Sequence, residues 1–388
     1  NTGKAAQRVT ASTRALTQTV ADVRGSVTLN AASAPAYVDS TGIARSYAKV
    51  TFGVGRGVDH LTFLAAGTLP DGFALRTILI DPTGAYTAYS IPQGASNGAR
   101  SEVRYPVAGT WTAYIAMSAS SAFNGSLKWE AIQQRATSIG RVSPSSFTLA
   151  PGQSRAVTVT TSQPRSPGDL SASVQLTGSV SGATSVPLSL RAVVPAANYT
   201  FSGTLSAGNG RAAPWVGQSQ VYYLDVPRGQ RDLGVGVTPS DTADTMMATL
   251  TAPNGQTYSW NSNAADGTGI QDYVRAPQAG RWMLTLETLD PVSGLVTQSS
   301  YRVAVRYNTV RVSAPTLPNR ARTTLAQGKA VTVPVTITNT GVAPLTYFAD
   351  ARLNQIGTIS LATLGSGENL TLPQPADQTP LWLVPSHV

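Results

Sequence analysis

Apolar and polar residues alternate along most of this chain, and a period of two is typical of β-strands with one buried face. Short phrases that contain Pro, Gly, Asn or Asp separate the alternating runs, and no helical period persists between them. The pattern therefore predicts an all-β protein. Three of the clearest runs are Leu170, Ala172, Val174 and Leu176, then Val186, Leu188 and Leu190, and finally Val331, Val333, Val335 and Ile337.

Two short phrases recur at one fixed spacing. The turn sequences DPTG at 81–84 and APNG at 252–255 are flanked by apolar runs, and they start 171 residues apart. Their Pro and Gly residues supply the fixed and the permissive backbone angles that tight turns need. The same offset carries AGTW at 108–111 onto AGRW at 279–282. One offset shared by two phrases indicates that a segment of the chain was duplicated.

A second pair of phrases alternates with the first. One begins at Val142 and contains LAPG, the other begins at Val312 and contains LAQG, and each leads into an alternating run. The order is therefore A-B-A-B, and strands at this density predict tandem β-sandwiches. The predicted boundaries are 1–24 for a linker or lead-in segment, 25–138 for module A1, 139–195 for module B1, 196–307 for module A2 and 308–388 for module B2.

The first residues are the least regular part of the chain. Val9, Leu16, Val20 and Val23 have a loose helical spacing, but the many threonines disfavour a helix, so a linker or a lead-in strand is predicted. This N-terminus lacks the apolar core of a signal peptide, which indicates a cytoplasmic or an already processed chain. No apolar run reaches the roughly 18 residues of a membrane-spanning helix, so no membrane span is predicted.

The chain is basic, with a formal net charge of +9. The charge comes mainly from arginines that are scattered singly, whereas nucleic-acid binding requires a clustered basic face, so no nucleic-acid partner is predicted. A weak general attraction to acidic polymers or cell-wall surfaces is expected instead. Because the chain has no cysteine, it has no disulfide, no thiolate metal ligand and no cysteine nucleophile.

The repeated phrases carry a family resemblance. Module A1, with ILIDPTG from Ile78 and YPVAGTWTAYI from Tyr105, resembles bacterial pre-peptidase C-terminal domains, and module A2 repeats the pattern with LTAPNG from Leu250 and APQAGRWMLTL from Ala276. Module B1, with SPSSFTLAPGQSRAVTVT from Ser143, resembles the fibronectin type III-like domain that follows the catalytic domain of many secreted subtilisin-like serine peptidases. The phrase VTITNTG in module B2 resembles bacterial immunoglobulin-like modules. The resemblance implies jelly-roll-like A modules and fibronectin- or immunoglobulin-like B modules.

The function that this resemblance implies is that of a non-catalytic accessory region of a secreted subtilisin-like (subtilase) serine peptidase. Such a region would brace the catalytic domain, aid secretion and help dock the enzyme on a protein substrate or a cell-surface polymer. The implied partner is a catalytic serine-peptidase domain or chain, and the implied location is extracellular or at the cell surface. Two alternatives stay open: a cell-surface adhesion or carbohydrate-binding array without a peptidase, and an independent hydrolase with an atypical active site.

No catalytic residue is assigned from this sequence. Only two histidines occur, and His60 directly follows Asp59 at the start of a predicted strand, where adjacent side chains point to opposite faces. Asp59 is therefore not expected to orient the His60 ring as a triad requires. The histidine and serine phrases of subtilisin-like enzymes are missing, and the 19 acidic residues lie mostly in turns. This chain by itself is predicted not to be an enzyme.

No cofactor and no metal site are predicted, although calcium stays a weak alternative. Some members of the A-type family bind calcium and many carry an acidic strand pattern, but the corresponding stretches keep only Asp71 in module A1 and Asp241 and Asp244 in module A2. Calcium needs about six to eight oxygen ligands. The acidic phrase at 263–272 predicts a glycine-rich hairpin loop.

Aromatic residues are the candidate ligand contacts. Trp111 and Trp282 share strand faces with apolar neighbours, which predicts that both lie in the cores. Tyr89 and Trp260 are related by the repeat offset and lie on strands bordered by Ser, Thr and Asn, so they could stack on sugar rings or dock an extended peptide. Packing beneath a loop is the alternative for both. Tyr258 is a further, weaker candidate.

Overall fold

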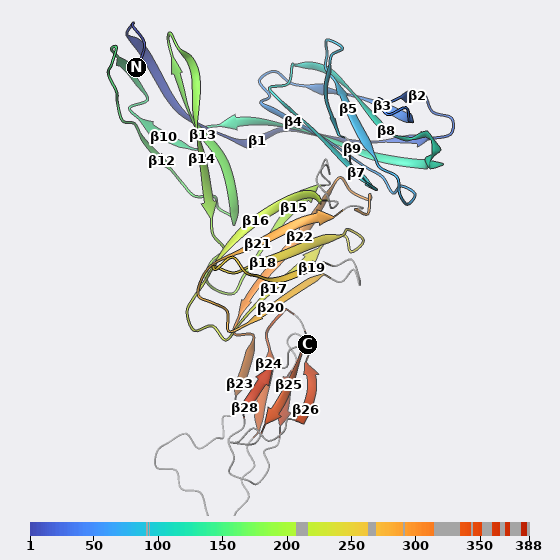
Figure 1. Cartoon of the computed structure of the whole chain (residues 1–388), viewed down its shortest axis with the longest axis vertical. Coiled ribbons are helices and arrows are strands. Elements are labelled where there is room, and N and C mark those ends of the chain that lie inside the picture. Colours follow the sequence, from blue (N-terminus) through green and yellow to red (C-terminus); the bar gives the residue numbers. More distant parts are fainter. Residues whose placement is uncertain are drawn as a thin grey trace, which may run out of the picture.

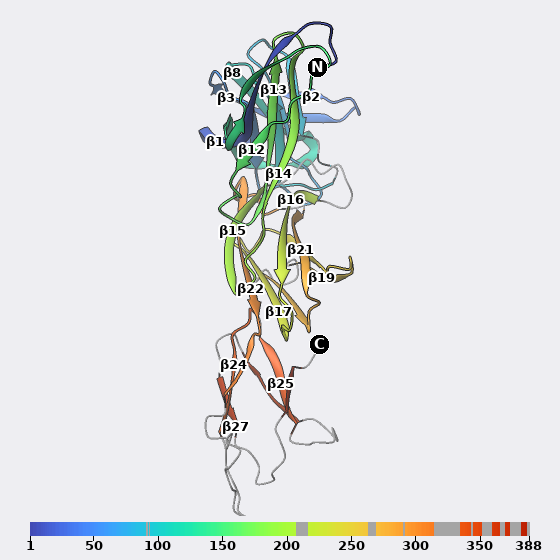
Figure 2. The same cartoon turned by 90° about the vertical axis from the view of Figure 1, so that its left-hand side faces the viewer.

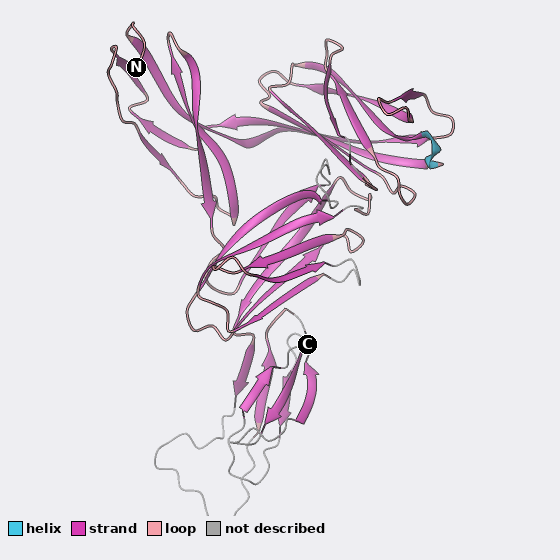
Figure 3. Ribbon diagram, viewed as in Figure 1, coloured by secondary structure: helices cyan, strands magenta, loops and turns pink. Residues whose placement is uncertain are grey.

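The chain forms an elongated molecule in a computed structural model, with modules A1 and B1 side by side at one end, module A2 in the middle and module B2 at the other end (Figures 1 and 2). Antiparallel strands make up nearly all of it, which confirms the predicted all-β fold (Figure 3). The structure describes residues 1–90, 92, 94–206, 216–262, 269–289, 292–313, 334–342, 344–350, 359–364, 369–372 and 382–385.

Within these residues the helical structure is a single 3₁₀ turn, Ala119–Ser121, and no described helix is long and apolar enough to cross a membrane.

Module A1 is a sandwich of two sheets. Its strands are β1 (Gln7–Asn30), β2 (Ala36–Val38), β3 (Ala44–Val54), β4 (His60–Ala66), β5 (Arg76–Ile80), β6 (Tyr86–Ser90), β7 (Gly98–Arg104), β8 (Gly109–Ser118) and β9 (Asn124–Thr137). One sheet has the order β2-β3-β8-β5-β6, and β1, β9, β4 and β7 form the other. The facing sides enclose a core in which Trp111 and Phe63 are fully buried.

Module B1 is small and lies against the N-terminal part of β1. Its own strands are β10 (Gly140–Ser143), β11 (Ser146–Leu149), β12 (Thr158–Thr161), β13 (Gly168–Gly178) and β14 (Gly182–Ala192). Strands β10 and β12 pair with each other, whereas β13 and β11 pair with β1. The buried cluster of this module consists of Val142, Val174 and Ala11, and Ala11 belongs to β1.

Strand β1 is shared by two modules. Thr10 and its neighbours pair with β11 and β13 of module B1, and the residues from Leu16 onward pair with β9 of module A1. Ala15 marks the change, because it pairs with Ala172 on one side and Thr137 on the other. Two register shifts follow directly, and such bulges bend and twist a strand. The segment predicted as a linker or lead-in strand is thus part of a single sheet that runs through both modules.

Module A2 repeats the sandwich of A1. Its strands are β15 (Tyr199–Ser206), β16 (Val216–Val226), β17 (Asp232–Pro239), β18 (Met246–Thr251), β19 (Thr257–Ser262), β20 (Ile270–Arg275), β21 (Gly280–Leu289) and β22 (Gln298–Tyr307). They form two four-stranded sheets, with the orders β15-β22-β17-β20 and β16-β21-β18-β19. Trp282 is fully buried between the sheets, as Trp111 is in A1, which confirms that both tryptophans are core residues.

The two copies share fine detail as well as overall form. The indole N–H of Trp111 donates to the Val107 carbonyl at 2.8 Å, and the indole N–H of Trp282 donates to the Gln278 carbonyl at the same distance. Each tryptophan follows a glycine with a positive φ that packs on the proline of the repeated turn. At Gly109 an added Cβ would come within 2.8 Å of Pro82, so the close approach requires glycine.

Module B2 contains two three-stranded sheets. The described strands are β23 (Val310–Ser313), β24 (Val335–Asn339), β25 (Leu345–Asp350), β26 (Ile359–Leu364), β27 (Asn369–Leu372) and β28 (Trp382–Pro385). The sheet orders are β23-β24-β27 and β26-β25-β28. Val335 and Ile337 of the predicted alternating run are buried on β24, whereas Val331 and Val333 lie outside the described residues.

A segment of module A2, residues 292–298, docks on module A1. Asn97 donates to the carbonyl of Val292 at 2.6 Å, and the Lys128 ammonium donates to the carbonyl of Leu295 at 2.6 Å. At the centre lies Glu130, which is 1% exposed and accepts hydrogen bonds from Gln298 at 3.0 Å and 3.1 Å. Thr297 and Arg24 also donate to this carboxylate. A buried charge with several donors ties the two A modules together.

The shared strand makes a specific prediction about module B1. The substitution Ala11→Asp places a carboxylate in the small cluster with Val142 and Val174, and a buried charge without partners is strongly unfavourable. We expect module B1 to open while module A1 stays folded, so that limited proteolysis cuts within 139–195. The matched control is Ser12→Asp, because Ser12 is the exposed neighbour on the same strand. Equal resistance of the two variants would contradict the role of β1 in the B1 core.

Candidate ligand-binding site

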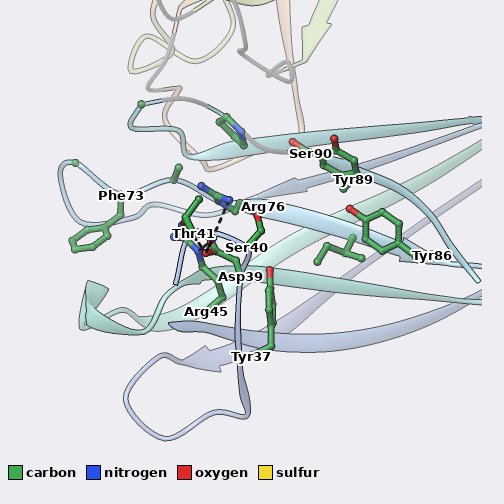
Figure 4. A pocket seen from close by; sticks show the side chains of 15 residues that line it. Tyr37, Asp39, Ser40, Thr41, Arg45, Phe73, Arg76, Tyr86, Tyr89 and Ser90 are labelled. Atoms are coloured by element: carbon green, nitrogen blue, oxygen red, sulfur yellow. Dashed lines mark hydrogen bonds and ion pairs between the residues drawn. The ribbon is translucent and has the colours of Figure 1, made fainter. Parts of the chain in front are cut away.

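A pocket of about 600 Å³ opens on the outer face of the five-stranded sheet of module A1 (Figure 4). It draws on the four strands β2, β3, β5 and β6 and on loops next to them. The residues that give it its character are Tyr37, Asp39, Arg45, Arg76, Tyr86 and Tyr89.

Strand alternation places these residues on the outer face. On β5, Thr77 and Leu79 are fully buried and point into the core, so the alternate residues Arg76 and Ile78 point outward. The Cα register then sets Ile78 opposite Tyr89 of β6 on one side and opposite Tyr114 of β8 on the other. Ile78 is thus an apolar floor between two aromatic side chains.

The two tyrosines of β6 reach the same pocket because of a bulge. Strict alternation would put Tyr86 and Tyr89 on opposite faces, since they are three residues apart. The pairing of β5 with β6 shifts register between Leu79 and Ile80, so one extra residue is accommodated in β6. The rings of Tyr86 and Tyr89 therefore come together, with centroids 5.7 Å apart and an interplanar angle of 35°.

The aromatic surface continues from the pocket across the sheet. The rings of Tyr37 and Tyr47 have centroids 6.2 Å apart, and Tyr47 meets Tyr114 edge-on at 4.9 Å. Burial raises the pKa of the Tyr37 phenol, so this hydroxyl stays protonated at neutral pH. In Figure 4 the Tyr37 hydroxyl points into the pocket, where it can donate to a ligand.

The acidic residue of the pocket, Asp39, begins a tight turn. One carboxylate oxygen, Oδ1, accepts from the Thr41 amide at 2.9 Å, the Thr41 hydroxyl at 2.6 Å and the Ile43 amide at 3.1 Å. Asp81 makes the same three contacts with Thr83 and Ala85 in the turn DPTG. The segment DSTG at 39–42 is therefore a second copy of that turn, placed beside the pocket.

The other oxygen of Asp39 faces two arginines. Arg45, whose side chain is 8% exposed, donates from Nε to Oδ2 at 2.8 Å, and Nη1 of Arg76 lies 3.7 Å from the same atom. The hydrogen bonds from Thr41 and Arg45 hold the pKa of Asp39 well below its usual range. Asp39 is therefore ionised at neutral pH, and the two arginines around it leave this part of the pocket with a net positive charge.

Arg76 is the less satisfied of the two arginines. Its Nε is buried and has no hydrogen-bond partner among the described residues. Burial, together with the charge of Arg45, lowers the pKa of Arg76 from its usual value, although an arginine stays protonated in a protein. The pocket thus combines tyrosine rings that can stack on a ligand with the Arg76 guanidinium, which can donate further hydrogen bonds.

The predicted contact residues have different outcomes. Tyr89 lines the pocket, as its proposed role in ligand contact requires. Tyr258 is 46% exposed on β19, and its ring packs against Trp282 with the centroids 5.1 Å apart. It therefore shields part of the A2 core from solvent. Trp260 pairs with Thr249 in the Cα register, the counterpart of Tyr89 with Ile78, but its side chain lies outside the described residues.

Asp59 and His60 do not form a pair. The Asp59 carboxylate binds Arg14 and accepts from the Ala136 amide at 2.7 Å, whereas Nε2 of His60 lies 3.8 Å from the Glu102 carboxylate. Nδ1 of His60 lies 3.5 Å from the Thr62 hydroxyl. The two side chains therefore contact different groups.

Two acidic residues considered for calcium, Asp241 and Asp244, instead bind the loop that contains Ser293. Asp241 and Asp244 both accept from Ser293, the first from its hydroxyl at 2.7 Å and the second from its amide at 2.9 Å. Ser299 also donates to Asp244. Across the described part of the chain, no group of three or more His, Cys, Asp or Glu side chains is arranged to hold a metal ion.

The sequence carries almost no signal for this pocket. Tyr37, Asp39, Arg45 and Arg76 come from β2, β3, β5 and one turn, and nothing in their spacing shows that they meet. One signal was present, because DSTG at 39–42 repeats the pattern of DPTG at 81–84 and marks a structured turn.

Comparisons with known proteins do not assign the chain. No family model and no curated protein matches it. Among solved structures, the M60 catalytic domain with two CBM51 domains of Clostridium perfringens ZmpB is 8% identical with a TM-score of 0.18, and the match covers 75% of this chain but only 38% of that one. The PBSX exported protein XepA is 11% identical with a TM-score of 0.20, and the match covers 74% of this chain and 86% of that one.

The BSP domain of a biofilm associated protein is 9% identical with a TM-score of 0.18, covering 92% of this chain and 61% of that one. Likenesses at these TM-scores carry no argument about function, so the site has to be judged by its own chemistry.

The pKa of Asp39 makes a prediction about acid stability. Because its pKa is lower in the folded than in the unfolded protein, its contribution is complete above about pH 4 and is lost as the pH falls further. We expect the gap in unfolding free energy between wild type and Asp39→Asn to be constant near neutral pH and to shrink below about pH 4. Urea titrations from pH 7 to pH 2 measure this gap, with the exposed Asp71→Asn as control. A gap that stays constant down to pH 2 would contradict the assignment.

Proposed function

We propose that this chain is a non-catalytic, extracellular binding protein, and that the pocket of module A1 binds a saccharide. The observation that carries the proposal is the set of tyrosines on one outer sheet face, with Tyr37, Tyr86 and Tyr89 around a pocket of about 600 Å³. Aromatic faces suit the apolar faces of sugar rings, and a phenol hydroxyl adds a directed hydrogen bond. The polar groups beside them supply orientation.

The duplicate module supports a specialised role for this pocket. The positions of A2 that correspond to Arg76, Ile78 and Tyr86 carry Met247, Thr249 and Thr257. The Cα register confirms these equivalences, since Thr249 pairs with Trp260 as Ile78 pairs with Tyr89. The sandwich is common to both copies, whereas the charged and aromatic side chains at these positions belong to A1 alone.

A variant at Tyr89 tests the proposal. Loss of one stacking ring costs about 0.5–1.5 kcal/mol, so Tyr89→Ala should weaken binding to an oligosaccharide roughly three- to tenfold. Calorimetric titration against a panel of neutral and acidic oligosaccharides measures the effect. Tyr105→Ala is the matched control, because it removes an exposed tyrosine of the same module that does not line the pocket. Absence of binding to every sugar, or an equal loss in both variants, would rule out the pocket as a saccharide site.

The link to a serine peptidase is a separate proposal that rests on the sequence resemblance of the A and B modules. Saccharide binding fits an accessory region that places a secreted enzyme on a cell-surface polymer. We expect protein purified from its native source to co-elute with, or be cut from, a chain that reacts with a fluorophosphonate serine-hydrolase probe. Detection of a single unlabelled species by intact mass would remove the peptidase and leave the saccharide-binding array.

A further inference from the structure

The positive charge of the A1 pocket is compensated only in part. Oδ1 of Asp39 is engaged by the turn residues Thr41 and Ile43, and Oδ2 is engaged by Arg45 at 2.8 Å. Arg76 comes no closer than 3.7 Å to that carboxylate, a distance beyond hydrogen bonding. One carboxylate therefore faces two guanidinium groups, and Arg76 is the group without a close anionic partner among the described residues.

Arg76 also has an unsatisfied donor. Its Nε is buried without a hydrogen-bond partner in the described chain, and its side chain is 19% exposed, so part of the guanidinium reaches the pocket. The exposed part of this guanidinium lines the pocket and can donate hydrogen bonds to a ligand carboxylate there. The planar fork of an arginine matches the two oxygens of a carboxylate better than it matches a single hydroxyl.

The position of Arg76 relative to the tyrosines fixes where an anion would sit. Ile78 lies directly opposite Tyr89 in the sheet register, and Arg76 is two residues before Ile78, so Arg76 and Tyr89 are diagonal neighbours. Diagonal neighbours on one sheet face have Cα atoms roughly 7–8 Å apart. One sugar unit can bridge that distance, with its ring against a tyrosine and an acidic substituent directed at Arg76 (Figure 4).

We propose that the saccharide bound by this pocket is an acidic one, in which the carboxylate of a hexuronate unit pairs with Arg76 while its ring stacks on Tyr86 and Tyr89. This inference rests on the proposed function and names its ligand class. The net charge of +9 acts in the same direction, because it draws the whole chain toward polyanionic surfaces. Arg45 and Thr41 hold the Asp39 carboxylate in place, and Nη1 of Arg76 lies 3.7 Å from that carboxylate.

An extended acidic peptide fits the pocket less well. A peptide would use the backbone of an open sheet edge, whereas the pocket offers ring faces and side-chain donors above the sheet. Nucleic acid requires a clustered basic face, and the arginines of this chain are scattered.

The test compares three trisaccharides that differ only in the group at C6 of each sugar unit, which is a carboxylate, a methyl ester or a hydroxymethyl group. Calorimetric titration of the full chain with tri-galacturonate, its methyl ester and neutral galactotriose should give at least tenfold tighter binding of the free acid. Because the ester removes the ligand charge and leaves the protein unchanged, this comparison does not depend on any variant being folded. Raising the salt concentration should narrow the difference between acid and ester.

Two variants place the effect at Arg76. Arg76→Gln should reduce affinity for tri-galacturonate to that of the ester and leave binding of the ester nearly unchanged. Arg104→Gln is the matched control, since it removes one exposed positive charge from the same module outside the pocket. Tyr89→Ala should lower the affinity for every sugar that binds, whatever its charge. This effect separates ring stacking from recognition of the carboxylate.

The outcomes distinguish the ligand class from the proposed function. Equal affinity for acid, ester and neutral trimer would overturn the acidic-sugar inference and leave saccharide binding intact. Binding of poly-glutamate as tightly as tri-galacturonate, with the same loss in Arg76→Gln, would show that any carboxylate polymer is accepted and would overturn recognition of the sugar. Failure of all three trimers to bind would remove the proposed function together with the inference.

Discussion

The backbone hydrogen bonds of strand β1 are the constraint on which modules A1 and B1 depend. Near Thr10 both edges of β1 pair within module B1, one with β11 and the other with β13. Beyond Leu16 the strand pairs with β9 of module A1. Bulges just after the crossing provide the bend that lets one strand serve two sandwiches. Because Ala11 of this strand also belongs to the B1 core, module B1 depends on a strand that it shares with module A1.

The contact between modules A1 and A2 also depends on groups that the two modules share. Glu130 is buried on β9, yet its carboxylate receives donors from Thr297 and Gln298 of module A2. Burial of a carboxylate is tolerable only when donors satisfy it, so the docking segment and this residue require each other. These contacts between the modules set the direction in which the A1 pocket faces relative to module A2.

Duplication explains both the common scaffold and the difference between the copies. The tryptophan, glycine and proline packing is retained in each sandwich because it stabilises the core. The outer sheet face takes no part in this core packing, and its residues differ between the two copies. In A1 this face carries a turn whose aspartate lies next to two arginines, together with tyrosines brought to one side by a bulge in β6. The candidate site is therefore separate from the packing that stabilises the sandwich.

The sequence by itself determined the local and the repeated features of this protein. Period-two alternation determined the strands, because side-chain direction follows directly from residue number within a strand. The offset of the phrases around Trp111 and Trp282 determined the duplicated cores. Tyr89 is a candidate contact because of its polar surroundings and the repeat offset that it shares with Trp260. Tertiary structure decided which strand edges pair, so only the fold revealed that β1 joins two modules. It also decided the pocket, since the meeting of Asp39 with Arg76 depends on long-range strand pairing and the shared face of Tyr86 and Tyr89 on a one-residue bulge, and neither leaves a periodic trace in the sequence.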